Sequence, residues 1–153
     1  MSTVQVDTIN ESTTGSGVTV DGVLIKDTGI ESFNLKDYSE TIQTLTSSSG
    51  VVSVDMNSGN VGTITLSENV TDIDFTNVPT SGAVSFVLQI TQDSSDRTVA
   101  INAITVNAGS HVTAKTVGAG GYTMTTGSGK IDIVTFIFFN AGTPHLNALQ
   151  DMG

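Results

Sequence analysis

From residue 51 onward, the sequence is a series of short runs in which apolar residues alternate with polar ones. The clearest run is 83–91, where Val84, Phe86, Leu88 and Ile90 occupy every second position. Alternation with a period of two is typical of a strand that has one buried face. Turn residues separate the runs at intervals of about 8–12 residues, which predicts an all-β fold, an antiparallel β-sandwich or jelly roll. The predicted strands lie within residues 51–56, 61–66, 70–75, 83–91, 99–106 and 130–140.

Charge and composition exclude several classes of function. The chain has 153 residues, with 5 Lys and Arg against 15 Asp and Glu, for a formal net charge of −10. Nucleic-acid binding is not expected, because phosphate contacts need clustered basic residues. The absence of Cys excludes disulfides, thiolate metal sites and cysteine nucleophiles, and it fits synthesis in a reducing cytoplasm. No apolar segment has the length of a membrane span, and the N-terminus lacks the features of a secretory signal, so no membrane partner is expected.

The first thirty residues differ from the rest of the chain. Two β-branched runs, 18–20 and 23–26, are separated by Asp21-Gly22, which predicts a short hairpin. A hairpin of this size is marginal alone in water. The sequence therefore predicts an extended N-terminal β segment, residues 1–30, followed by a β-sandwich domain, residues 31–153. Residues 1–30 alone cannot bury their apolar side chains, which we expect to form an assembly interface, with packing onto the chain's own sandwich as the alternative. These residues are Val4, Val6, Ile9, Val18, Val20, Val23, Leu24 and Ile25.

Residues 34–46 fit two interpretations. Leu35, Tyr38, Ile42 and Leu45 have helical spacing, whereas the threonines among them disfavour a helix. The sequence favours a strand from about Tyr38 to Leu45, with a helical turn as the alternative.

The run 131–139 is apolar on both faces. Phe136 and Phe138 alternate with Ile137 and Phe139, so each face of the strand carries large apolar side chains. An outer face of a two-layer sandwich normally meets water and is polar. Two explanations remain open: a loop or the C-terminal tail covers the second face, or this face lies at a subunit interface.

Titratable residues give little sign of chemistry. Neither His111 nor His145 has a carboxylate within four positions, so neither is oriented as a general base by its sequence neighbours. Asp72 and Asp74 project from the same face of one predicted strand. Such a pair could serve a glycosidase or bind a divalent ion, but solvated surface residues are the favoured interpretation.

Two turns resemble ligand loops only superficially. Asp93 and Asp96 could form part of a calcium site, although Asp at turn positions also caps the backbone by itself. The run 118–121 is glycine-rich but lacks the strand-to-helix setting and the lysine of a phosphate loop. We therefore expect no catalytic, cofactor-binding or metal-binding residues, and a protein that is not an enzyme.

The order of several short motifs resembles structural proteins of tailed bacteriophages, notably those of marine and cyanobacterial phages. The segments 7–11 and 17–27 are similar to a repeated segment of their fibre-like proteins, and the resemblance continues over nearly the whole chain. The family often has Trp-Pro and Trp-Tyr pairs where this chain has Ala100-Ile101-Asn102 and Pro144-His145-Leu146. The remaining motifs are 38–41, 54–55, 59–61, 66–71, 89–93, 97–99 and 127–136.

This resemblance implies a non-enzymatic virion protein, a homotrimer on the outer surface of a particle made in the host cytoplasm. The first expectation is a capsid decoration or cement protein (head fibre) that binds the major capsid protein. One alternative is a tail-fibre or tail-adaptor component that contacts other fibre proteins or the host surface. Another is a carbohydrate-binding module or a glycan hydrolase.

Overall fold

The computed structural model describes residues 36, 38–116 and 121–152. Contacts divide the chain into two units, Met1–Tyr38 and Ser39–Gly153, and the description below concerns the second unit. The predicted N-terminal hairpin, its eight interface residues and the boundary at residue 30 lie outside the described residues. So does most of the glycine-rich turn, residues 118–120.

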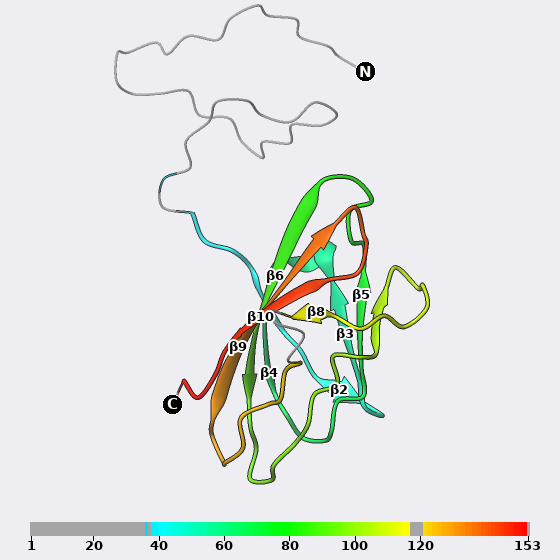
Figure 1. Cartoon of the computed structure of the whole chain (residues 1–153). Helices are drawn as coiled ribbons and strands as arrows, with labels where there is room; N and C mark the ends of the chain where they lie inside the picture. The colour runs from blue at the N-terminus through cyan, green and yellow to red at the C-terminus, as the bar shows by residue number, and fades with distance from the viewer. Residues whose placement is uncertain (1–35, 37, 117–120, 153) are drawn as a thin grey trace, which may run out of the picture. The chain divides into compact units, whose positions relative to one another are not determined.

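The second unit is built from two β-sheets, and the prediction of an all-β sandwich is confirmed (Figure 1). In the described residues, the only helical element is a single 3-10 turn, η1 (Met56–Ser58). The six-stranded sheet has the order β1 (Ile42–Thr44), β4 (Val61–Thr65), β6 (Ala83–Thr91), β9 (Ile131–Phe139), β10 (His145–Leu149) and β8 (Lys115–Thr116). The four-stranded sheet has the order β2 (Ser47–Ser48), β3 (Val51–Asp55), β5 (Asp72–Thr76) and β7 (Ile104–Val106).

Pairing within the sheets is mixed, which corrects the expectation of an antiparallel sandwich. The ladders β6–β9, β9–β10 and β2–β3 are antiparallel, and the other five are parallel. From β3 to β8, successive strands alternate between the two sheets. Parallel neighbours need a crossover connection, and for the pairs β3–β5, β4–β6 and β5–β7 one strand of the opposite sheet supplies it. Strand spacing in the sequence does not reveal this alternation, because it says nothing about which sheet each strand joins.

Four phenylalanines form the centre of the core between the sheets. Phe75 of β5 packs against Phe86 of β6 and against Phe136 and Phe138 of β9, with ring centroids 5.7, 5.2 and 4.9 Å away. All four side chains are fully buried. Burying each large apolar side chain is worth roughly 1.5–3 kcal/mol, so this cluster holds the two sheets together. The alternation predicted for 83–91 and 131–139 assigns these residues to the inner face correctly.

One glycine is required by this packing. A Cβ on Gly62 of β4 would lie 2.7 Å from the Phe86 ring and 3.0 Å from the Leu45 side chain. No side chain fits there without moving the core. The absence of a side chain at Gly62 therefore leaves the space that the Phe86 ring occupies beside β4.

The ambiguous segment before residue 50 is extended, so the strand interpretation is confirmed and the helical turn is wrong. The strand β1 is shorter than predicted, and Leu45 leaves it to enter the core. The following serines pair with β3 through a turn at Ser49 and Gly50, whose φ values are 55° and 79°. Two positive φ values in a two-residue loop match a tight β-hairpin turn.

The strand β10 was not predicted. Its sequence, His145-Leu-Asn-Ala-Leu149, contains few residues that favour strands. It forms because β9 offers an unpaired edge, and all five of its residues pair with β9 from Ile137 back to Ile133.

Candidate interaction surface

Five strands of the six-stranded sheet, β1, β4, β6, β9 and β10, share an outer face without Asp, Glu, Lys or Arg, which we call the neutral face. Lys115 of the sixth strand, β8, borders this face in register with His145. The neutral face consists of the side chains that alternate with the buried ones along the five strands. His145 is the one ionisable group among them. The members are Ile42, Thr44, Val61, Thr63, Thr65, Ala83, Ser85, Val87, Gln89, Thr91, Ile131, Ile133, Thr135, Ile137, Phe139, His145, Asn147 and Leu149.

Large apolar side chains are exposed on the neutral face. Ile42, Ile137, Phe139 and Leu149 have 58, 36, 54 and 56% of their surface accessible. The Phe139 ring contacts the His145 imidazole edge-on, with 5.6 Å between ring centroids. Within the described part of the chain, the C-terminal residues extend the edge of the sheet as β10 and do not cover this face. The other explanation for the apolar side chains on both faces of β9 is an interface with another molecule.

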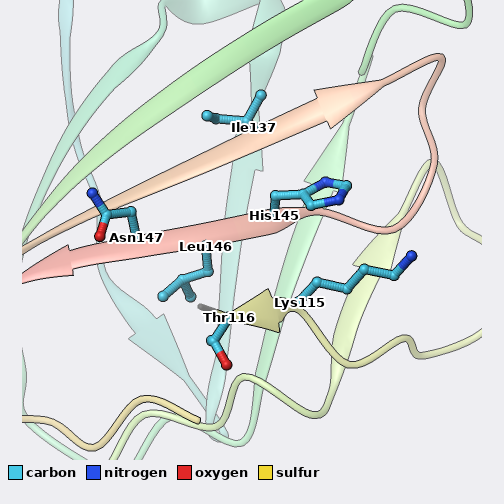
Figure 2. A pocket seen from close by; sticks show the side chains of 6 residues that line it. All are labelled: Lys115, Thr116, Ile137, His145, Leu146 and Asn147. Carbon is cyan, nitrogen blue, oxygen red and sulfur yellow. The ribbon is translucent and has the colours of Figure 1, made fainter. Parts of the chain in front are cut away.

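A shallow cavity of about 500 Å³ opens where β8, β9 and β10 run side by side. Figure 2 shows Ile137 on β9, with His145 and Asn147 on β10. His145 lies in register between Ile137 and Lys115 of β8. The cavity therefore offers an apolar wall with an amine and an imidazole beside it. The residues that line the cavity include no carboxylate.

The outer face of the four-stranded sheet has the opposite character, and we call it the acidic face. It carries Asp55 of β3 and Asp72 and Asp74 of β5, together with Ser53 and Thr105. The prediction that Asp72 and Asp74 share one face is confirmed, and both are half-buried.

His111 approaches Asp72, which the sequence did not reveal. Its Nε2 atom lies 3.6 Å from the Asp72 carboxylate, and the Thr105 hydroxyl donates to the same carboxylate at 3.4 Å. The two residues are far apart in the sequence and meet because Val112 bridges to Ile104, next to β5 in the sheet. The Thr105 hydroxyl donates to the carboxylate and not to the imidazole, so Thr105 is not activated by His111.

Asp55 closes a turn at the end of β3. Its carboxylate accepts hydrogen bonds from the Asn77 side chain at 2.7 Å, the Asn57 amide at 2.9 Å and the Ser58 hydroxyl at 3.3 Å. These donors, the Asn77 amide first, hold the pKa of Asp55 below its ordinary value. The carboxylate therefore acts as the cap of the η1 turn.

Asp93 and Asp96 are likewise occupied by donors of the fold. Asp93 accepts from the Ser95 amide and from Arg97, which together lower its pKa. Asp96 accepts from the Gly127 amide at 2.7 Å. Over residues 38–116 and 121–152, no three His, Asp or Glu side chains gather into a set that could hold a metal ion.

A buried carboxylate anchors the C-terminal segment. Asp132 of β9 is fully buried and accepts hydrogen bonds from the Tyr122 hydroxyl and the Thr125 amide at 2.9 Å and from the Asp151 amide at 3.0 Å. Burial raises the pKa of Asp132, but the donors from Thr125, Asp151 and Tyr122 outweigh it and leave the pKa below its ordinary value. Burial and the adjacent carboxylate raise the pKa of Tyr122. The network ties loop 121–125 and the C-terminus to β9.

Comparison with protein-family models, with curated proteins and with solved structures finds no match to this chain. Among the described residues, no helix has the length and hydropathy that crossing a membrane requires.

Proposed function

We propose that this chain is a non-enzymatic structural protein of a tailed-bacteriophage virion. In this proposal it is a capsid decoration or cement protein that binds the outside of the capsid. Residues 1–30 attach it to the major capsid protein, several copies assemble, and the sandwich points outward. The order of sequence motifs described above suggests the virion.

The observation that carries a structural role is the neutral face. An uncharged sheet surface with four exposed large apolar side chains is typical of a surface that contacts protein. The polar groups elsewhere support the same role, because Asp55, Asp93, Asp96 and Asp132 hold turns and strand ends in place.

The number of copies per particle tests this proposal. Quantitative mass spectrometry of purified virions should find on the order of hundreds of copies, as symmetric coverage of a capsid requires. A few to a few tens of copies would instead support the tail-fibre or tail-adaptor alternative. Absence of the chain from purified particles would contradict both.

The attachment role of residues 1–30 has a separate test. A chain lacking residues 1–27 should keep its β-sheet circular dichroism spectrum and melt cooperatively, yet fail to co-sediment with capsids. As a matched control, Thr98→Glu changes an exposed residue of the sandwich and should leave co-sedimentation intact. Unfolding of the truncated chain would show that the N-terminal segment belongs to the sandwich core.

A further inference from the structure

We propose that the neutral face is the surface through which copies of this chain associate, so that its occupant is a second copy. This inference rests on the structural role proposed above, in which several copies act together. It assigns the contact to β1, β4, β6, β9 and β10 of the sandwich.

The contact that we propose includes the end of β9, which lies at one end of the neutral face. Phe139 is opposite Ala83 of β6, and Ile137 lies between Ser85 and His145 in the sheet. Ala83 and Ser85 are small, and the Phe139 ring packs edge-on against the His145 imidazole. Exposed large apolar groups beside hydroxyl and amide side chains are typical of protein interfaces.

The distribution of charge over the two outer faces favours a second copy of the chain as the partner of the neutral face. The chain carries a formal net charge of −10, so copies repel each other at most orientations. The acidic face would bring Asp55, Asp72 and Asp74 of one copy against those of another. Of the two outer faces, the neutral face is the one on which copies meet without opposing carboxylates. A cationic partner would be drawn to the acidic face instead.

The polar groups of the neutral face are also complementary to themselves. Gln89, Asn147 and the threonine hydroxyls each carry both donors and acceptors of hydrogen bonds. A second copy of the same face therefore supplies a partner for each kind of group without any charge. A nonpolar surface such as a lipid tail region would leave these groups without partners.

The face is large enough to hold two copies together. Strands about 4.8 Å apart, with a rise of about 3.3 Å per residue, give the five strands a flat area of ~500 Å². A specific interface buries at least roughly 1,000 Å² in total, half of it from each partner. Two such faces reach that value.

Sedimentation velocity of the isolated full-length chain tests the inference. Between about 1 and about 100 μM, the wild-type protein should sediment as an oligomer of the 15.8 kDa chain. Phe139→Glu replaces one of the most exposed large apolar side chains of the neutral face with a carboxylate. This change should weaken association at least ~10-fold, since a few large anchors dominate interfaces. Thr98→Glu adds the same charge at an exposed position outside the neutral face and should leave association unchanged.

A wild-type chain that stays at 15.8 kDa throughout this range would overturn the inference. So would an oligomer that persists unchanged in Phe139→Glu. Circular dichroism and a thermal melt verify that the variant is folded. If it is not, the pair Phe139→Ser and Leu149→Ser replaces it, because both residues are more than half exposed and carry no core contact. The measurement contains no virions, so it can fail while the copy number supports the decoration role, and the reverse also holds.

Discussion

The two outer faces of the sandwich are built by the same strand alternation and yet differ in chemistry. Outward positions of the four-stranded sheet carry three carboxylates; Asn77 donates to Asp55, Thr105 donates to Asp72, and His111 lies 3.6 Å from Asp72. Outward positions of β9 carry Ile137 and Phe139, which are exposed and have no charge beside them on their strand. In the association that we propose, the neutral face contacts a second copy and the acidic face does not.

The phenylalanine core lies between the two outer faces, and a substitution there should reduce the free energy of unfolding most. Phe75→Ala removes the ring that packs against Phe86, Phe136 and Phe138. We expect the free energy of unfolding to fall by about 3–5 kcal/mol, a large part of the stability of an ordinary domain. Urea unfolding followed by circular dichroism measures this change. A loss below about 1 kcal/mol would show that the two sheets do not depend on this ring.

Substitution of the buried carboxylate of Asp132 should have the next largest effect on the free energy of unfolding. Asp132→Asn keeps the shape but leaves at least one of the Thr125 and Asp151 amides without an acceptor. We expect a loss of about 1–3 kcal/mol at neutral pH, the usual result of an unsatisfied buried donor. Asp96→Asn, at an exposed turn with a single donor, is the matched control and should lose less.

The same network predicts a pH dependence. The pKa of Asp132 is lower in the folded chain than its ordinary value of about 3.9. Its contribution to stability is therefore complete above that value and is lost as the pH falls through the lower folded pKa. Between about pH 5 and pH 2, the melting temperature of the wild-type chain should drop more steeply than that of Asp132→Asn. Parallel curves for the two proteins would contradict this assignment.

The acidic face should tolerate losing charge. The Asp74 Oδ1 atom is buried without a hydrogen-bond partner, and Asp72 lies two residues away on the same face. Asp74→Thr removes a desolvated carboxylate and its repulsion, so we expect the free energy of unfolding to rise by about 0.5–1 kcal/mol. Asp72→Thr, which loses the contacts of Thr105 and His111, should show no such gain. Equal effects of the two substitutions in urea unfolding would refute the difference between them.

The pattern of apolar residues in the sequence predicted β3, β4, β5, β6 and β9, together with their buried side chains. It could not predict the parallel pairing, because consecutive strands alternate between sheets. Nor could it predict β10, whose residues favour a strand only when the edge of β9 is present. Tertiary context determines both features.

Candidate site residues were predictable only where one strand contains them. The shared face of Asp72 and Asp74 followed from their spacing, whereas the contact of Asp72 with His111 depends on distant segments. The burial of Asp132 was predictable from the sequence, since Asp132, Phe136 and Phe138 are an even number of residues apart and lie on the same face of β9. The neutral face was predictable in the same way, from every second residue of β9 and of the strands beside it.

Thiol labelling tests the central claim, the burial of the neutral face between copies, most directly. The chain contains no Cys, so each single-cysteine variant reports one position. Ser85→Cys on the neutral face and Ser53→Cys on the acidic face replace exposed serines with little change in size. As the concentration rises from about 1 to about 100 μM, alkylation at position 85 should slow by at least tenfold, while the rate at position 53 stays constant. An unchanged rate at position 85, or equal slowing at both positions, would contradict the account.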